Sequence, residues 1–297
     1  MKTSIGFVGL GLMGDCMATR LLNAGYKISV FNRTKEKAQS LIASGAKWCE
    51  SPKSVASQSE IVLSMVSNSD ALLEIATGKE GVLHGLQEGN IHIDMSTVSP
   101  VATRQLGEEY AKKKCSFLHS PVLGSVPQAT DGSLLLFVGG RDEPFRRAED
   151  VLRILGSKIW RFDLPEQASH TKLLCNLFIA GMGTTLAQAL VYATKASVNP
   201  ETLLDIISHS SLSAPMYQTK GKSILERNFT PRFFVEHMLK DVNLILESGR
   251  TINAPLPTAR VAEELFSAAV RAGYGKEDYS AVVKVVEQQA GVEVKKQ

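Results

Sequence analysis

The stretch that decides the fold is IGFVGLGLMG, residues 5–14. An apolar run suited to a buried strand leads directly into the spacing Gly-x-Gly-x-x-Gly, and residues 12–24 continue with helical periodicity. In such a strand–loop–helix unit Gly9 allows a tight turn, Gly11 lets a pyrophosphate approach the backbone, and Gly14 lets the helix pack closely. Free N–H groups at the start of the helix attract phosphate. We therefore expect a dinucleotide-binding loop, with a plain glycine turn as the alternative.

The residues after the second expected strand indicate which dinucleotide binds. Asn32 stands 18 residues after Gly14, where NAD enzymes usually place Asp or Glu for the ribose 2′-hydroxyl, and Arg33 and Thr34 follow it. A carboxylate would repel a 2′-phosphate, whereas guanidinium and hydroxyl groups bind one. The sequence therefore favours NADP over NAD. If Arg33 is only a solvated surface charge, either nucleotide would bind.

Around this unit, short β-branched runs alternate with helical patterns through the first half of the chain. Such alternation predicts a mostly parallel, doubly wound sheet with helices on both faces. Strands are expected at Ile5–Val8, Lys27–Phe31, Ile61–Met65, Ile91–Asp94, Cys115–Leu118, Leu134–Val138 and Ile159–Phe162. Helices are expected at Leu12–Ala24, Lys35–Ser44 and Glu143–Leu155, with Gly25 and Gly45 just past the first two ends.

After Pro165 the patterns are helical only. One long helix is expected over Gln167–Ala196, and residues 292–297 are expected to form a frayed polar tail. Further helix boundaries are indicated by Asn199-Pro200 at a start and by Gly249 and Gly273 after ends. We thus predict an α/β domain over residues 1–164 and an all-helical domain over residues 165–297.

The composition excludes several classes of protein. Of the 297 residues 44% are hydrophobic and 21% are charged, which excludes a mostly disordered chain. The net charge is only +3, and the basic run Lys112–Lys114 is typical of a solvated helix end, so no nucleic-acid partner is expected. The apolar stretch 177–191 is interrupted by polar residues and is shorter than the ~20 residues of a membrane span, which favours a buried core helix and no membrane partner.

Cysteine spacing and the first residues favour a cytoplasmic protein. The four cysteines form no Cys-x-x-Cys pair, so reduced thiols and no metal site are expected at Cys16, Cys49, Cys115 and Cys175. The glycines of residues 5–14 argue against a signal peptide in that apolar segment.

Candidate ligand-binding residues follow the expected strands, because open α/β sheets bind ligands at the carboxyl ends of their strands. They are Met65, Val66 and Asn68 after one strand, and Ser96 and Thr97 after the next. Ser96 or Thr97 could donate to a nicotinamide or to a substrate carboxylate, while Ser99 is better explained as a helix N-cap. Residues 122–125 follow a further strand in a proline–glycine turn whose consecutive N–H groups could bind an anion, although such turns are common.

Lys172 is the candidate for proton transfer. It lies in the first turns of the long helix, with Asn176 one turn later on the same face and with apolar neighbours at 173, 174, 177 and 178. A half-buried lysine has a depressed pKa and can exchange a proton near neutral pH. From periodicity alone, a structural lysine whose stem covers apolar surface is the more common case. By the same reasoning Lys240-Asp241 is a surface pair in the apolar helix expected over residues 233–246.

Together these residues resemble the β-hydroxyacid dehydrogenase family, which includes 3-hydroxyisobutyrate dehydrogenase and the glyoxylate/succinic semialdehyde reductases. The resemblance covers almost the whole chain, and residues 5–14 look like the family's N-terminal signature. Asp94–Thr97 looks like the family's cofactor-contacting segment, and Pro121–Gly124 with Gly132 and Gly139-Gly140 looks like its substrate loop. Lys172 with Asn176 looks like the catalytic lysine and its helical neighbour. Lys240-Asp241 looks like the C-terminal pair that faces cofactor and substrate.

The resemblance implies a Rossmann domain and a helical domain joined by a long interdomain helix, an active site in the cleft between them, and a homodimer or homotetramer formed through the helical domain. Asn32-Arg33-Thr34 is similar to the NADP-using reductase branch. The implied cofactor-binding residues are Gly9, Leu10, Gly11, Leu12, Met13, Gly14, Asn32, Arg33, Thr34, Met65, Val66, Asn68, Thr97 and Lys240. The implied substrate-binding residues are Ser96, Val122, Leu123, Gly124, Ser125 and Lys240, together with the catalytic Lys172 and Asn176.

Three positions depart from the family pattern. The substrate loop usually reads Pro-Val-Ser-Gly-Gly, but here Leu123 replaces the serine and Ser125 the second glycine. Leu123 removes one donor for a substrate carboxylate and adds apolar bulk, whereas Ser125 could restore a hydroxyl nearby. His119 stands where an acidic residue is common. These departures bear on the choice of substrate more than on the type of reaction.

The sequence therefore predicts an NADPH-dependent reductase of a small aldehyde or keto acid that bears a carboxylate, such as glyoxylate or succinic semialdehyde, with Lys172 as general acid and base. The alternative reaction is NAD(P)-dependent oxidation of a substrate like 3-hydroxyisobutyrate, 3-hydroxypropionate or serine. Imine reduction and a non-catalytic scaffold are further alternatives. Lys172 argues against both, because relatives of those kinds generally have another residue there.

Overall fold

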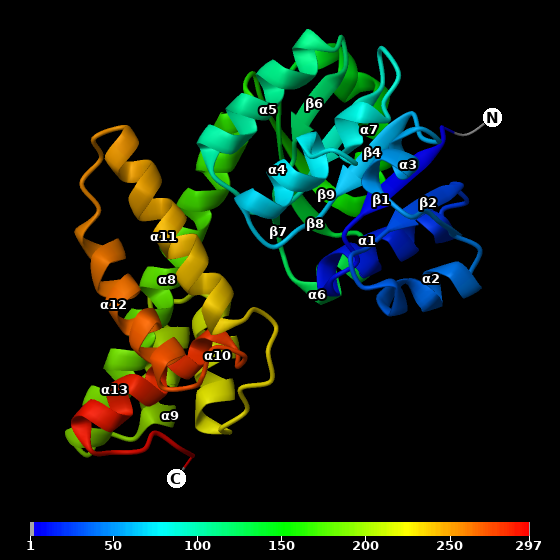
Figure 1. Cartoon of the computed structure of the whole chain (residues 1–297). Helices are drawn as coiled ribbons and strands as arrows, with labels where there is room; N and C mark the ends of the chain where they lie inside the picture. Colours follow the sequence, from blue (N-terminus) through cyan, green and yellow to red (C-terminus); the bar gives the residue numbers. More distant parts are fainter. Residues whose placement is uncertain (1–2, 297) are drawn as a thin grey trace. The chain divides into compact units, whose positions relative to one another are not determined.

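A computed structural model describes residues 3–296 (Figure 1). The chain divides into two compact units, Met1–Lys172 and Leu173–Gln297. The division falls inside helix α8 (Pro165–Lys195), whereas the predicted domain boundary after residue 164 coincides with the start of that helix. The predicted long helix is confirmed by the 31 residues of α8.

The described part of the first unit is built on a nine-stranded sheet with the order β3-β2-β1-β4-β5-β6-β8-β7, and β9 pairs with β8. The strands are β1 (Ile5–Val8), β2 (Ile28–Phe31), β3 (Lys47–Trp48), β4 (Ile61–Ser64), β5 (Ile91–Asp94), β6 (Ser116–His119), β7 (Val122–Leu123), β8 (Leu134–Gly139) and β9 (Gly156–Phe162). All pairs among β1 to β6 are parallel, and β8 is antiparallel to β6 and β7. The predicted mostly parallel, doubly wound α/β fold is confirmed.

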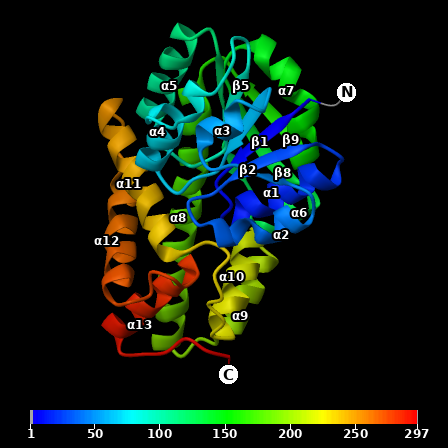
Figure 2. The same cartoon turned by 45° about the vertical axis from the view of Figure 1, so that its right-hand side comes forward.

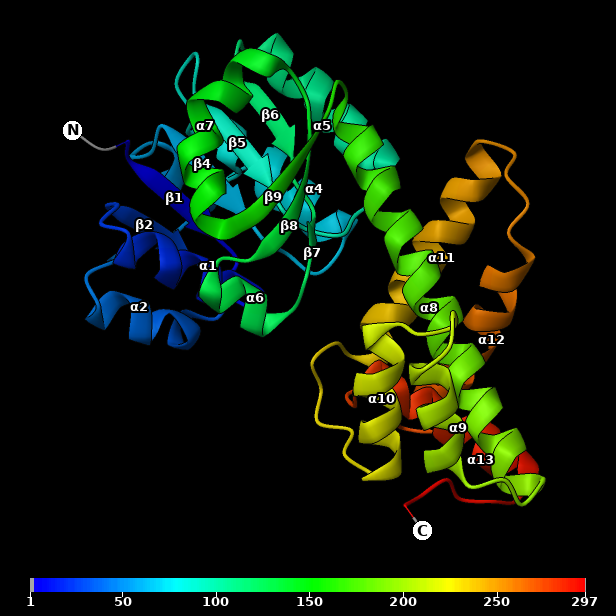
Figure 3. The ribbon, with the colours of Figure 1, turned by 180° about the vertical axis from the view of Figure 1, so that it is seen from behind.

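Helices cover both faces of this sheet because successive strand residues point to opposite sides. The helical segments are α1 (Leu12–Asn23), η1 (Lys35–Ala38), α2 (Gln39–Ala43), α3 (Pro52–Ala56), α4 (Ser69–Thr77), η2 (Val82–His84), α5 (Pro100–Lys112), α6 (Val126–Asp131) and α7 (Asp142–Leu155). In β4, Ile61 and Leu63 join the apolar cluster that includes α1 and α7, while Val62 joins the cluster with α3, α4 and α5. Figures 2 and 3 show these two helical layers from different sides.

Four details differ from the expectations for the chain. The short strands β3 and β7 were not predicted, and the helix expected over Lys35–Ser44 is a 3₁₀ turn followed by a short α-helix. The tail is not frayed as predicted, since Val294 is fully buried, its carbonyl accepts from Arg227 Nη1, and the Lys296 N–H donates to the Leu225 carbonyl; Gln297 lies outside the described residues. Gly249 does not follow a helix end but lies inside α11 (Val235–Thr251).

The end of α11 has its own signal at Asn253. Asn253 has φ +56°, the Ala254 N–H donates to the Gly249 carbonyl, and the Asn253 N–H donates to the Arg250 carbonyl. This is a Schellman motif with asparagine in the left-handed position. Gly249 serves packing instead, because a Cβ there would lie 2.5 Å from Leu256 Cδ1. Gly273, in contrast, follows the end of α12 with φ +90°, as predicted.

The second unit is helical. Besides the second part of α8 it contains α9 (Pro200–Ser208), α10 (Pro215–Leu225), α11, α12 (Pro257–Arg271), η3 (Tyr279–Val282) and α13 (Val283–Ala290). Figures 1 and 2 show α11 and α12 side by side, and both contribute to one apolar core with α8 and α13. Between residues 167 and 296 the only strand-like pairing is an isolated bridge from Phe234 to Asp278. The predicted all-helical second half is confirmed.

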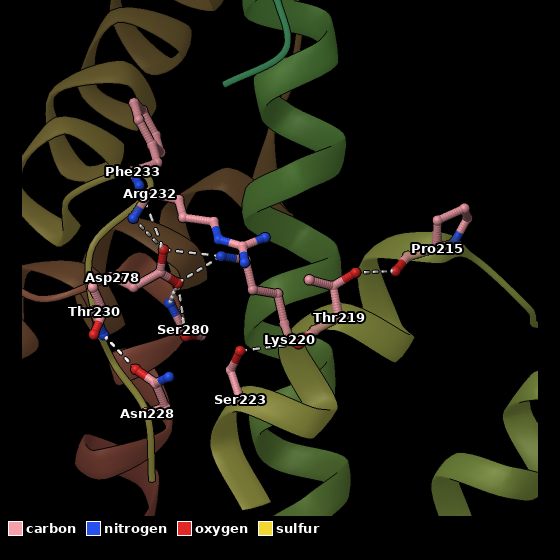
Figure 4. A network of polar contacts seen from close by, with 10 residues as sticks. All are labelled: Pro215, Thr219, Lys220, Ser223, Asn228, Thr230, Arg232, Phe233, Asp278 and Ser280. Carbon is pink, nitrogen blue, oxygen red and sulfur yellow. Dashed lines mark hydrogen bonds and ion pairs between the residues drawn. The ribbon is translucent and has the colours of Figure 1, made fainter. Parts of the chain in front are cut away.

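A buried ion pair ties α10 to the segments before α11 and at η3 (Figure 4). Lys220 Nζ lies 2.7 and 2.9 Å from the carboxylate oxygens of Asp278, and both side chains are almost fully buried. The same carboxylate accepts hydrogen bonds from the backbone N–H of Arg232 and from both the N–H and the hydroxyl of Ser280. The segment before α11 is therefore held by contacts to one buried acid.

Helix α8 is longer than the apolar stretch that suggested a core helix. By length and composition alone it could cross a membrane, although core helices of soluble proteins pass the same test and 44% of its most apolar window is buried within the chain. Leu186, Ala187 and Leu190 are buried in the core of the second unit, as predicted. Phe178 and Tyr192 are more than 70% exposed, so a second face of the helix presents large apolar side chains.

Candidate functional site

The glycine loop has the geometry that its spacing predicts. Gly9 has φ +95°, and a Cβ there would lie 2.3 Å from the Met65 carbonyl oxygen. A Cβ on Gly14 would lie 2.0 Å from the Gly9 carbonyl oxygen, so only glycine lets α1 start this close to the loop. A Cβ on Gly11 would meet nothing within 4 Å. The loop is tight at its two ends and open in the middle, where a phosphate would approach.

The start of α1 fits an anionic ligand. Gly11 is the N-cap and has no side chain, so the cap residue makes no side-chain hydrogen bond to the first N–H groups of the helix. Leu12 is 57% exposed, whereas Leu10 is buried and Met13 packs against the core. Backbone groups of the loop, rather than the side chains of Leu10 or Met13, are therefore the groups that could hold a pyrophosphate.

Asn32 ties the glycine loop to the end of β2. Its Oδ1 accepts from the Leu10 N–H at 2.9 Å, and its Nδ2 donates to the Thr34 carbonyl at 2.8 Å. An amide serves both contacts because it accepts and donates at once. Arg33 and Thr34 are exposed beside it. Neutral and basic groups therefore stand at the position where NAD enzymes usually have a carboxylate, and a carboxylate there would repel a 2′-phosphate.

The loops after β4 and β5 are joined by Ser96. The Ser96 hydroxyl donates to Asp94 Oδ1 at 2.8 Å and accepts from the Val66 N–H at 2.8 Å, and the residue is fully buried. In this structure the hydroxyl has no hydrogen left for a nicotinamide or a substrate carboxylate, contrary to the role considered for it. Asn68 caps α4 through the Ala71 N–H, and Ser99 caps α5 as predicted. Thr97 is half-buried.

The segment 122–125 is not the open turn that the sequence suggested. Val122 and Leu123 form β7 opposite Leu136 and Leu135 of β8, so they do not form a loop that presents a row of free N–H groups. Ser125 is the N-cap of α6 in a capping box: its hydroxyl accepts from the backbone of Gln128, and its own N–H donates to Gln128 Oε1 at 2.9 Å. Ser125 therefore stabilises a helix start and does not simply replace the missing serine hydroxyl. Gly124, at φ +141°, connects the two elements.

Lys172 and Asn176 lie one turn apart on α8. Both are buried, at 8% and 2% exposure, so Lys172 is more buried than predicted. Leu173 is buried too, but Leu174 and Phe178 are exposed. At about 100° per residue these two point away from the face of Lys172. Of the apolar neighbours expected to form a buried surface around Lys172 and Asn176, Leu173 is thus buried, whereas Leu174 and Phe178 are not.

In the second unit, Asp241 connects Asn176 with Lys240. Asn176 Nδ2 donates to Asp241 Oδ2 at 2.6 Å, and Lys240 Nζ lies 2.9 Å from Asp241 Oδ1. Asp241 is 1% exposed, so Lys240-Asp241 is not the surface pair that the residues alone suggested. The resemblance named Lys240-Asp241 as a cofactor- and substrate-facing pair, but the contact of Asp241 with Asn176 was not predicted. The sequence feature that could have indicated this contact is an acidic residue at a position that the helical period of α11 places on its buried face.

Among residues 3–296 no group of three or more His, Cys, Asp or Glu side chains is placed to bind a metal ion. None of the four cysteines forms a disulfide within the described residues. The polar groups collected above are instead suited to bind a phosphorylated nucleotide and to move a proton.

Comparison with known proteins agrees with this geometry. Residues 4–162 match the family model described as the NAD-binding domain of 6-phosphogluconate dehydrogenase. Residues 167–286 match the model described as the NAD-binding domain of NADP-dependent 3-hydroxyisobutyrate dehydrogenase.

Individual relatives extend over nearly the whole chain. Glyoxylate/succinic semialdehyde reductase 1 of Arabidopsis thaliana is 34% identical over 95% of this chain and 98% of its own length. The 2-(hydroxymethyl)glutarate dehydrogenase of Eubacterium barkeri is 34% identical over 98% of this chain and 97% of its own. The structure of 3-hydroxyisobutyrate dehydrogenase from Mycobacterium tuberculosis with L-serine superimposes with a TM-score of 0.88 at 26% identity, covering 96% of this chain and 99% of that one. The chain belongs to the β-hydroxyacid dehydrogenase family, oxidoreductases that act on the CH–OH group of hydroxyacids.

Proposed function

We propose that this protein catalyses the NADPH-dependent reduction of a small aldehyde or keto acid that bears a carboxylate, and the reverse oxidation of the hydroxyacid. Glyoxylate and succinic semialdehyde are the first substrates to test, because a relative named for both is 34% identical to the chain. The observation that carries the proposal is the buried amine of Lys172, one helical turn from Asn176.

The first unit supports the nucleotide assignment. The open backbone at Gly11, the uncapped start of α1 and the bridging amide of Asn32 form a cradle for a pyrophosphate and its ribose. Arg33 and Thr34 would hold a 2′-phosphate, which is why we propose NADP rather than NAD. When bound, the nicotinamide nucleotide supplies the hydride for the carbonyl carbon.

Lys172 supplies the proton. The carbonyl oxygen becomes an alkoxide as the carbon is reduced, and the Lys172 ammonium donates one proton to that oxygen; in the oxidation the neutral amine removes it. Asn176 is oriented by its 2.6 Å hydrogen bond to Asp241, so its remaining amide hydrogen and its carbonyl keep a fixed direction. The Lys240–Asp241 pair fixes a second amine on α11, which we assign to binding of the nucleotide and the substrate carboxylate.

The experiment is NADPH consumption by the purified chain with glyoxylate, succinic semialdehyde and a cyclic imine. Lys172→Ala is expected to reduce turnover by ~10²-fold or more with an unchanged dissociation constant for NADPH, because only the proton transfer is lost. Lys195→Ala, at an exposed position of the same helix, is the matched control and should behave as the unaltered protein. Turnover that survives in Lys172→Ala removes the role of Lys172. Consumption with the imine but with neither aldehyde would favour imine reduction.

We also propose that the chain forms a homodimer or homotetramer through its helical part. The support is the exposed apolar face of α8, on which Leu174, Phe178 and Tyr192 are more than half exposed. Phe178→Glu is expected to lower the mass measured by light scattering during gel filtration. An unchanged mass in that variant would exclude this face.

A further inference from the structure

Three polar side chains lie in register at the carboxyl ends of β4, β5 and β6. Ser64 pairs with Asp94, and Asp94 pairs with His119, so in these parallel strands the three side chains point to the same face of the sheet. All three are fully buried. We call Ser64, Asp94 and His119 the polar row.

A chain of hydrogen bonds leads from Tyr110 through His92 and Ser64 to Asp94. Ser64 Oγ lies 2.7 Å from Asp94 Oδ1 and 2.9 Å from His92 Nε2. A carboxylate only accepts, so Ser64 donates its hydrogen to Asp94 and must accept one from His92 Nε2. His92 Nδ1 then accepts from the Tyr110 hydroxyl, 2.6 Å away. With His92 in its neutral form, the chain of donors ends on an Asp94 carboxylate.

The pKa shifts agree with this assignment. Burial lowers the pKa of His92 to about 4 and raises that of Tyr110 well above its usual value. Burial by itself would raise the pKa of Asp94, but His119 and the hydroxyl of Ser64 outweigh it and lower that pKa. Asp94 is thus an anion that its neighbours stabilise.

Asp94 in turn holds two loops. Its Oδ1 accepts from the Ser96 hydroxyl and its Oδ2 from the Ser96 N–H at 3.2 Å, and the Ser96 hydroxyl accepts from the Val66 N–H. Val66 follows β4 and Ser96 follows β5, at the edge of the sheet where a nucleotide binds in this fold. The position of both loops depends on an ionised Asp94.

A buried carboxylate needs hydrogen-bond donors or a paired group around it. Beside Ser64 and Ser96, a further polar side chain lies next to this carboxylate: His119, whose Nδ1 is 3.3 Å from Asp94 Oδ2. Within the described residues neither ring nitrogen of His119 has a hydrogen-bond partner, so the approach of Nδ1 to the Asp94 carboxylate is the polar contact that this ring makes. We propose that His119 is a positioning residue: paired with Asp94, it fixes the loops at Val66 and Ser96 that receive the nicotinamide nucleotide.

A hydrolytic Ser–His–Asp role for the same residues does not fit. In such a triad one histidine lies between the acid and the serine, whereas here Asp94 accepts directly from the Ser64 hydroxyl. Ser64, His92 and Asp94 have no exposed surface, so no substrate reaches the hydroxyl.

The test is direct NADPH binding by isothermal titration calorimetry, which needs no substrate. His119→Leu is expected to weaken binding at least tenfold, while His119→Asn, whose amide can place an N–H near the position of Nδ1, stays within about threefold of the unaltered protein. His84→Leu, at an exposed histidine of the same unit, is the matched control and should bind as the unaltered protein does. A merely structural role would lower the urea midpoint without a change in affinity, so equal affinity in a folded His119→Leu overturns the proposal. Equally weak binding by the asparagine variant overturns it too.

Should His119→Leu fail to fold, the double variant Asp94→Asn/His119→Leu removes the uncompensated charge. It is expected to fold and to bind NADPH at least tenfold more weakly, because an amide cannot accept all the hydrogen bonds that the two carboxylate oxygens accept. Full affinity in that variant contradicts the proposal. The inference rests on the proposed nucleotide binding: an unaltered protein that binds neither NADPH nor NADH refutes that binding, whereas normal binding by all variants refutes the positioning role alone.

Discussion

The stability of the first unit is expected to fall as the pH falls from 6.5 to about 4, because of His92. Burial lowers the pKa of this imidazole to about 4, from 6.5 for a solvated histidine. Between these values the unfolded chain binds a proton that the folded chain excludes, so the free energy of unfolding decreases with decreasing pH. The difference between 6.5 and about 4, at 1.36 kcal/mol per pH unit, corresponds to a loss of about 3 kcal/mol, absent above the unfolded pKa and complete below the folded one.

Urea unfolding followed by tryptophan fluorescence measures this loss. Both tryptophans, Trp48 and Trp160, lie in the first unit, so the signal reports that unit. His92→Gln keeps an N–H for Ser64 but does not titrate, so its loss of stability between pH ~7 and ~4 should be about 3 kcal/mol smaller than that of the unaltered protein. His84→Gln changes an exposed histidine and should show the full loss. Equal losses in His92→Gln and in the unaltered protein would refute the reasoning.

Three further substitutions test the fold and the nucleotide loop. Lys220→Met leaves the Asp278 carboxylate buried without its counter-charge, although the carboxylate keeps its backbone and hydroxyl donors. The free energy of unfolding is therefore expected to fall by ~3 kcal/mol, as measured by urea unfolding followed by circular dichroism. The double variant Lys220→Met/Asp278→Asn should recover most of it, and no recovery would count against the ion pair. Arg33→Asp is expected to raise the KM for NADPH at least tenfold and to shift kcat/KM toward NADH; an unchanged ratio would mean that Arg33 does not touch the 2′-phosphate. Gly14→Ala is expected to abolish nucleotide binding in calorimetry, because its Cβ would lie 2.0 Å from the Gly9 carbonyl oxygen, and retained affinity would contradict the close packing.

Much of the fold could be predicted because its signals are local. The strand, loop and helix of residues 5–24 follow from a short apolar run, three glycines and helical spacing, and the structure reproduces them within a residue. The strands β3 and β7 could not be predicted, since two residues have no period and their pairing depends on neighbours distant in the sequence. The helix end predicted at Gly249 was wrong because a glycine can allow close packing inside a helix as well as follow a helix end.

The candidate site was predictable to a different degree in its two parts. The conformation of the glycine loop is set by spacing along one segment, so it could be derived before the structure. The contacts of Asn32, Ser96 and Asp241 could not be derived, because they join segments that lie far apart in the sequence. Whether a serine hydroxyl is free or already donates to a buried acid depends on strand register, which the residues alone do not reveal.

The polar row also acts on folding itself. In β5, Ile91 and Ile93 face one apolar layer while His92 and Asp94 face the other side. A slip of this strand by a single residue would exchange the two sets, placing an unpaired acid among isoleucines and leucines and leaving the donors of Ser64 and Tyr110 without acceptors. Misaligned sheets are thereby penalised by several kcal/mol. The side chains that we propose to hold the nucleotide-binding loops would thus also select the correct alignment of the central strands.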